Sequence, residues 1–187
     1  MSFPEAYRQD CLKTLHLIDT ALVQKAIDMF AEARARDRQI FVCGNGGSAA
    51  TASHFVCDMV KGASFNRQKR FRIQALTDSM PTITAYSNDV AYEAVFVEQL
   101  KNFARPGDLV MGISGSGNSP NVLRAIEYAN SIGCETIGLT GRDGGKLAAL
   151  SKLNIHVPNP HMGRIEDAHM IICHMICYYF MDADGKC

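Results

Sequence analysis

Two ionisable side chains, His54 and Asp58, stand four positions apart, shortly after the glycine-rich turn at residues 44–48. On a helix, this spacing places both side chains on one face. A histidine beside a carboxylate suits a metal site, an acid/base pair or an ordinary hydrogen-bonded pair at the surface. The two residues alone leave these three possibilities open.

A second group of ionisable residues lies near the C-terminus, in and just before the apolar stretch MIICHMICYYF. It contains Glu166, Asp167, His169 and His174. On a helix, His169 and His174 point about 140° apart, so one of them is expected to be structural, and helical geometry does not say which. Asp89, in SNDVAYE, is a further candidate, with a helix or turn cap as its alternative role.

The glycine-rich turn itself, GNGGSA at 44–49, fits the loose G-x-G-x-x-G/A pattern of dinucleotide sites. Such sites also need an acidic residue about twenty positions further on, and Asp78 lies too far beyond the glycines for that role. We therefore expect no nucleotide cofactor. The turn is instead expected to bring backbone close to another phosphate.

A second loop, SGSGNS at 114–119, offers the hydroxyls of Ser114, Ser116 and Ser119 just before Pro120. Proline is favoured in the first turn of a helix, and a helix N-terminus attracts phosphate through its free N–H groups and its dipole. The loop lacks the G-K-[ST] ending of a nucleoside triphosphate site. Phosphate binding is the prediction, and a plain turn with Ser119 as the helix cap is the alternative.

The elements that would position these residues alternate along the chain. Strands are expected at 39–43, 72–76, 109–113, 134–140 and 153–157, and helices at about 48–61, from residue 120 and at 164–181. Such alternation predicts a doubly wound α/β fold with a mainly five-stranded parallel sheet. Ligands of these sheets bind beyond the carboxyl ends of the strands, where both loops fall.

Residues 1–37 are predicted to form a helical arm ahead of the α/β core at 38–187, within a single domain. Apolar residues recur every three or four positions from Leu12 to Ala33, and Asp19 and Thr20 are placed to cap a second helix where the pattern breaks. The apolar stripe must cover this chain's own sheet or another subunit. Of these two, we favour a subunit interface.

The composition excludes several classes of protein. The chain of 187 residues is 47% hydrophobic with a formal net charge of +0, which is typical of a globular domain and not of a nucleic-acid binder. It shows neither a signal peptide nor an apolar run that could span a membrane. Its seven cysteines are scattered without a C-x-x-C pair, which favours reduced thiols and a cytoplasmic location.

Taken together, the strand followed by GNGGS, the loop GISGSGNSPNV, the turn LTGRDGGKLA and the segment RIEDAHMIICH resemble the sugar isomerase (SIS) family. Within it they are most similar to the phosphoheptose isomerases, over nearly the whole chain. The resemblance implies aldose–ketose isomerisation of sedoheptulose 7-phosphate to D-glycero-D-manno-heptose 7-phosphate through an enediol(ate). It also implies a role in the heptose synthesis that serves lipopolysaccharide, and a homotetramer with active sites at subunit interfaces.

The resemblance also assigns residues. Asp58 falls on the position of the catalytic base and His174 on that of the acid. The four ligand positions of a zinc ion fall on His54, Asp58, Glu166 and His174. The implied contacts to substrate and phosphate are Asn45, Gly46, Gly47, Ser48, Asp89, Ser114, Gly115, Ser116, Ser119 and Glu166.

This sequence departs from the family pattern at several places. Asp58 replaces the usual Glu, Glu166 the usual Gln, Gly115 the usual Thr, and Lys61-Gly62 the usual Gly-Arg pair. The alternative function is that of a non-catalytic SIS relative that binds a replication initiator. That relative lacks ionisable groups at the two catalytic positions, whereas Asp58 and His174 supply them here, so an enzyme is expected.

Overall fold

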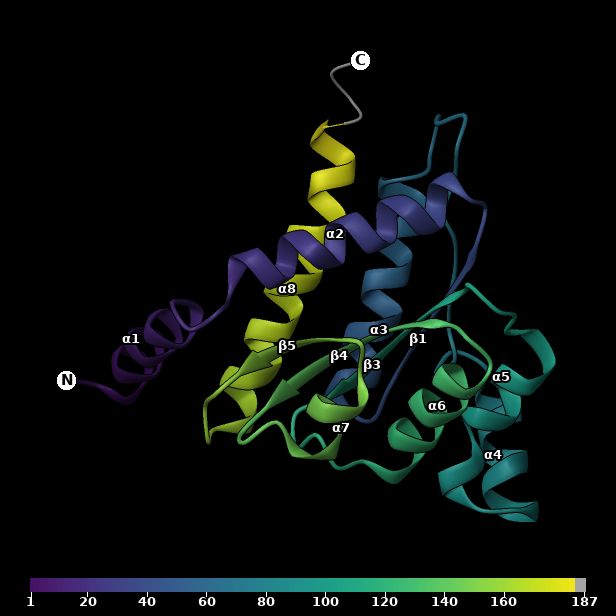
Figure 1. The fold of residues 1–187 in the computed structure, drawn as a ribbon. Helices are drawn as coiled ribbons and strands as arrows, with labels where there is room; N and C mark the ends of the chain where they lie inside the picture. The colour runs from purple at the N-terminus through teal and green to yellow at the C-terminus, as the bar shows by residue number, and fades with distance from the viewer. Residues whose placement is uncertain (184–187) are drawn as a thin grey trace.

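The structure, a computed structural model, describes residues 1–183, so Cys187 lies outside the described part. A single sheet of five parallel strands forms its centre (Figure 1). The strands are β1 (Gln39–Gly44), β2 (Arg72–Ala75), β3 (Leu109–Ser114), β4 (Glu135–Gly141) and β5 (Leu153–Val157). The expected number, direction and approximate positions of the strands are thus confirmed.

The strand order is β2-β1-β3-β4-β5. The connection after β1 leads to one edge of the sheet and the connection after β3 leads toward the other, so the strand order reverses between these two strands. These two strands pair directly, with Val42 opposite Met111 and Gly44 opposite Ile113. The helices that follow them cover opposite faces, because α3 (Gly47–Cys57) and α6 (Pro120–Ser131) belong to different cores. A crevice for ligands opens at such a reversal, beyond the carboxyl ends of the strands.

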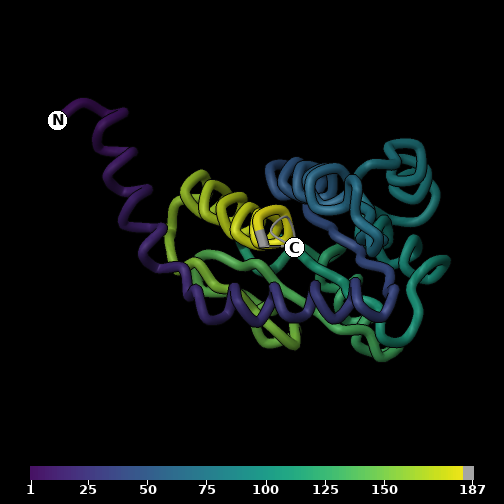
Figure 2. The backbone as a smooth tube through the Cα atoms, turned by 90° about the horizontal axis from the view of Figure 1, so that it is seen from above, coloured from purple at the N-terminus to yellow at the C-terminus, as the bar shows by residue number. Residues whose placement is uncertain are grey.

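One face of the sheet is covered by α2 (Thr20–Ala35), α3 and α8 (Met162–Ala183), as the view in Figure 2 shows. Strands that are buried on both faces need apolar side chains in both directions. On this face, Phe30 of α2 meets Phe55 of α3 edge to face, with ring centroids 5.4 Å apart. Burial of these aromatic side chains fixes how α2 and α3 lie over the strands.

The other face packs against α5 (Val97–Phe103), α6 and α7 (Gly145–Leu150), with α4 (Met80–Asp89) and the short 3-10 helix η2 (Tyr92–Ala94) beside them. Phe41 and Val110, which are neighbours of the residues that point to the first face, point here. The sequence analysis did not predict α4, α5 or α7. They are short, and their apolar residues do not form a long helical stripe.

The N-terminal arm consists of α1 (Phe3–Leu15) and α2. Asp19 caps α2 as expected, since its carboxylate accepts hydrogen bonds from the backbone N–H groups of Ala21 (2.9 Å) and Leu22 (3.2 Å). The apolar stripe divides between the two helices. The α2 part covers the chain's own sheet, which corrects the favoured subunit interface for that half, while Leu12 of α1 remains 54% exposed. Figure 2 shows α1 extending away from the body.

Candidate active site

The glycine loop after β1 and the serine loop after β3 meet at the carboxyl ends of these two strands. Between them lies a cavity of about 250 Å³. Its lining consists of Asn45, Gly46, Gly47, Ser48, Ile113, Ser114, Gly115, Ser116, Ser119, Met162 and Glu166. Except for Asp89, every residue that the sequence analysis assigned to substrate or phosphate contacts therefore faces one space.

Three hydroxyls gather on the serine-loop side of this cavity. Ser114 Oγ lies 2.9 Å from Ser119 Oγ and 3.4 Å from Ser116 Oγ. Ser119 is the residue before α6, but its side chain makes no capping hydrogen bond. Its hydroxyl oxygen accepts no hydrogen bond from the first turn of α6, which argues against the plain capped turn. Together with the N-terminus of α6, the three hydroxyls form an environment suited to a phosphate group.

Two glycines of the cavity leave room for side chains of α8. A Cβ atom at Gly47 would lie 2.5 Å from Glu166 Oε1, and one at Gly115 would lie 2.5 Å from Met162 Sδ. A threonine at position 115, the usual family residue, would therefore require the Met162 side chain to move. The start of α8 thus closes the cavity against both loops.

A second cluster lies further along the same two helices. Asp58 Oδ2 is 3.3 Å from His54 Nε2 and 3.7 Å from His174 Nε2, and the two imidazole rings meet edge to face at 5.3 Å. One ligand atom from each of the three residues lies within 4.8 Å of the others. All three side chains are partly open to solvent, with Asp58 the least exposed at 24%. An imidazole–carboxylate–imidazole set with this spacing fits a zinc ion.

Glu166, the fourth ligand that the resemblance implied, is not part of this cluster. Its carboxylate lies against Gly47 in the cavity. Glu166 precedes His174 by more than two turns of α8, so about 12 Å of helix axis separates their Cα atoms. The structure therefore brings three of the four expected metal ligands together and places Glu166 beside the predicted phosphate site.

A change of helix type occurs at Asp58. There α3 gives way to the π-helix η1 (Asp58–Gly62), in which the N–H of Ala63 donates to the Asp58 carbonyl oxygen at 3.0 Å. The sequence analysis predicted an ordinary helix over 48–61 and missed this segment. Single π turns within helices occur often at functional sites, so the π turn is independent support for a special role of this position.

The structure distinguishes the two histidines of α8. His169 is 1% exposed and its Nε2 donates to the Thr140 carbonyl oxygen at 3.1 Å. Burial, the largest cause, lowers the pKa of His169 to about 4. His169 is therefore the structural histidine, and His174 faces the cluster. Asp89, exposed at the end of α4, accepts a hydrogen bond from Asn88 Nδ2 at 2.8 Å and does not line the cavity.

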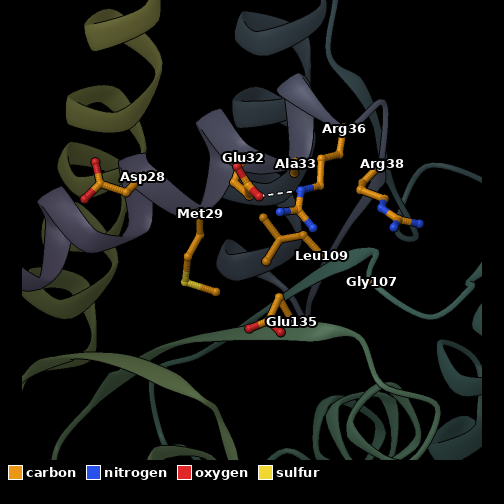
Figure 3. A pocket seen from close by; sticks show the side chains of 9 residues that line it. All are labelled: Asp28, Met29, Glu32, Ala33, Arg36, Arg38, Gly107, Leu109 and Glu135. Carbon is orange, nitrogen blue, oxygen red and sulfur yellow. Dashed lines mark ion pairs between the residues drawn. The ribbon is translucent and has the colours of Figure 1, made fainter.

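Another cavity, of about 430 Å³, opens at the amino ends of β1, β3 and β4 (Figure 3). Four of its lining residues, from Asp28 to Ala33, belong to α2, and Glu32 forms an ion pair with Arg36, which directly follows this helix. This cavity lies at the opposite edge of the sheet from the two loops. It contains none of the residues that the sequence analysis assigned to chemistry.

A doubly wound sheet with hydroxyl-rich loops at its reversal point, beside a cluster of two histidines and an aspartate, is typical of an α/β protein that binds a phosphorylated ligand. Residues 6–141 match the SIS domain, and the chain belongs to the SIS family. It is 41% identical to the phosphoheptose isomerase of Helicobacter hepaticus over 158 residues, which cover 84% of this chain and 80% of that protein. With the phosphoheptose isomerase of Aliarcobacter butzleri it shares 40% identity over 172 residues, 92% and 90% of the two chains.

The solved structures agree with these relatives. Phosphoheptose isomerase GmhA from Neisseria gonorrhoeae superposes with a TM-score of 0.87 at 34% identity, covering 94% of this chain and 95% of that one. A phosphoheptose isomerase from Francisella tularensis also reaches 0.87, at 27% identity, and covers 97% of this chain and 95% of that one. The predicted family and its fold are confirmed.

Proposed function

We infer that this chain is an aldose–ketose isomerase that converts sedoheptulose 7-phosphate to D-glycero-D-manno-heptose 7-phosphate. The observation that carries this inference is the placement of two different sites along one pair of helices. The hydroxyl-lined cavity lies at the start of α3 and α8, and His54, Asp58 and His174 lie two to three turns further along. Relatives named phosphoheptose isomerase, about 40% identical over most of the chain, support the same function.

The separation of the two sites suits a long sugar phosphate. In a seven-carbon 7-phosphate, the phosphate and the carbons that exchange the carbonyl lie at opposite ends of the molecule. The serine loop would hold the phosphate, and that binding energy would position the reacting carbons near Asp58 and His174. A shorter sugar phosphate held by the same loop would reach the cluster less well.

The reaction itself is a movement of protons. Asp58 would take a proton from C1 of the ketose and return it to C2, with an enediol(ate) between the two steps. His174 would donate a proton to the oxygen on C2 and accept one from the oxygen on C1. Atoms and electrons balance within the substrate, so the reaction needs no nucleotide cofactor.

Zinc belongs to this proposal as a metal held by His54, Asp58 and His174. When bound, it would supply Lewis-acid polarisation of the substrate carbonyl. Asp58 cannot hold a metal tightly and act as a free base at the same moment. His54, which is 51% exposed and adjacent to Asp58, is then the residue that keeps the carboxylate in place.

A homotetramer in the cytoplasm completes the proposal. Large apolar side chains remain exposed on α1, η1 and the second half of α8, which is the condition expected of surfaces that meet other subunits. They include Phe3, Leu12, Val60, Met175, Tyr178 and Tyr179. In the described part of the chain, no helix is long and apolar enough to cross a membrane.

The test is a coupled isomerase assay over five-, six- and seven-carbon sugar phosphates, with and without a chelator. We expect turnover of sedoheptulose 7-phosphate to exceed that of the shorter compounds. Loss of turnover in chelator and its return with zinc would support the metal. Tight binding of sugar phosphates without any turnover would contradict the isomerase and favour the non-catalytic SIS alternative.

A further inference from the structure

The two loops of the cavity are joined by a pair of side-chain amides. Asn45 follows β1 in the glycine loop, and Asn121 is the second residue of α6, where it is only 1% exposed. Asn45 Nδ2 donates to Asn121 Oδ1, and Asn121 Nδ2 donates to Asn45 Oδ1, each at 2.8 Å. The pair thus connects the segments on either side of the strand reversal.

Hydrogen-bond accounting determines which way these amides face. The backbone N–H of Val122, which can only donate, lies 3.0 Å from Asn121 Oδ1 and so identifies that atom as the oxygen. Asn121 must then present its NH₂ group to Asn45 Oδ1. Tyr92 Oη, from the 3-10 helix η2, donates to the same oxygen at 2.8 Å.

These contacts occupy every hydrogen-bonding group of the Asn45 side-chain amide except one N–H. Both lone pairs of its Oδ1 are occupied, by Asn121 and Tyr92, and one N–H is given to Asn121 Oδ1. The other N–H has no partner among the described residues, and Asn45 lines the cavity. A donor fixed in this way suits an oxygen atom of a ligand, and it cannot rotate to present its carbonyl oxygen without breaking three hydrogen bonds.

We propose that Tyr92 and Asn121 are positioning residues, which hold the Asn45 amide so that one N–H faces an oxygen of the bound sugar phosphate. The proposal rests on the proposed function, because it concerns the substrate of that reaction. It also gives the segment after Asp89 a role. Tyr92, three residues beyond Asp89, reaches the site through Asn45, whereas Asp89 does not line it.

The test compares wild type, Tyr92→Phe, Asn45→Ala and the double variant in the isomerase assay. Tyr92→Phe removes only a hydroxyl from a side chain that is 53% exposed, so the fold is expected to survive. The loss of one neutral hydrogen bond predicts a fall in kcat/KM of about three- to tenfold. If Tyr92 acts through Asn45, the double variant will match Asn45→Ala, because nothing remains for the hydroxyl to position.

Tyr128→Phe is the matched control, since the Tyr128 hydroxyl makes no hydrogen bond within residues 1–183, and wild-type kinetics are expected. Normal kcat/KM in Tyr92→Phe would overturn the proposal. The proposal would also be overturned if the kcat/KM of the double variant were lower than that of Asn45→Ala by the same factor that separates Tyr92→Phe from wild type. If wild type turns over no sugar phosphate, the proposed function fails. The same four proteins are then compared by the calorimetric Kd for sedoheptulose 7-phosphate, where the same non-additivity decides the inference.

Discussion

The carboxylate of Asp58 and the imidazole of His174 approach to 3.7 Å across the interface between α3 and α8. The helical segment formed by α3 and η1 runs parallel to α8, because Gly47 at its start lies against Glu166 and Gly62 at its end lies against Met181. At both positions the absence of a Cβ atom leaves room for the α8 side chain to lie against the backbone. The geometry of the proposed acid/base pair thus depends on packing at positions outside the pair.

Substitution of either member of this pair is expected to stop the reaction. Asp58→Asn removes the base and His174→Gln removes the group that moves protons between the oxygens, so each should lower kcat by at least about 100-fold. Both side chains are partly exposed, so the folded protein should remain. The measurements are steady-state kinetics and circular dichroism. His16→Gln, at the exposed end of α1, is the control, and normal turnover by either site variant would contradict the mechanism.

The position of Glu166 makes a separate prediction about zinc. Glu166→Gln is expected to leave zinc affinity within about twofold of wild type, because its carboxylate lies against Gly47 and outside the cluster. His54→Ala should weaken binding by about tenfold or more, since it removes one of three ligands. Calorimetric titration of zinc into each variant measures both effects. A large loss in Glu166→Gln would show that this side chain moves to the metal.

Removal of a negative charge beside the serine loop should also change substrate binding. Glu166→Gln is therefore expected to lower the KM for sugar phosphate, with a larger effect at low salt, because the Coulomb repulsion between carboxylate and phosphate is screened by ions. An unchanged KM across salt concentrations would mean that the phosphate does not bind in this cavity.

The serine loop supplies a further prediction, about folding. Gly117 has a φ of +66°, and a Cβ atom there would lie 2.0 Å from the Gly144 carbonyl oxygen. Gly133 has a similar φ of +83°, but its Cβ would meet only Pro106 at 3.9 Å. Gly133→Ala should cost about 1 kcal/mol from strain alone, and Gly117→Ala at least about 2 kcal/mol more. Urea unfolding measures both, and equal losses would contradict the contact with Gly144.

The sequence predicted the sheet well, because its buried strands are short apolar runs bounded by turn residues, and the alternation with helices fixes their parallel direction. Both loops were also predictable from sequence, because clusters of glycine and serine after a strand indicate backbone that approaches a ligand. The pattern could not predict α4, whose residues are all at least partly exposed, or the π turn at Asp58. The spacing of apolar residues reveals a helix only where one of its faces is buried. The helix α4 has no buried residue, and a π turn alters the apolar spacing too little to be recognised.

The candidate site was predictable only in part. Helical spacing joined His54 to Asp58, but the choice between His169 and His174 needed the register of α8 on the sheet, which places His169 against Thr140. Glu166 was expected at the metal because the family resemblance assigned that role to its position in the sequence. The resemblance gave no information on where the Glu166 side chain points. Tyr92 carried no signal in the sequence, because its contact with Asn45 depends on how η2 folds back over the loops.

The buried His169 predicts a pH dependence of stability. Burial lowers its pKa from the ordinary value of 6.5 to about 4, so between these values the unfolded chain binds a proton that the folded chain does not. The free energy of unfolding should therefore fall as the pH drops from about 6.5 to about 4, by roughly 3 kcal/mol from this residue.

Urea unfolding of wild type and His169→Gln at pH 7 and pH 4, at one protein concentration, tests this expectation. Glutamine keeps an N–H donor for the Thr140 carbonyl oxygen but does not titrate, so the variant should lose about 3 kcal/mol less than wild type over that range. His16→Gln should follow wild type, because His16 is exposed. The same pH dependence in wild type and His169→Gln would show that His169 is protonated alike in the folded and unfolded states.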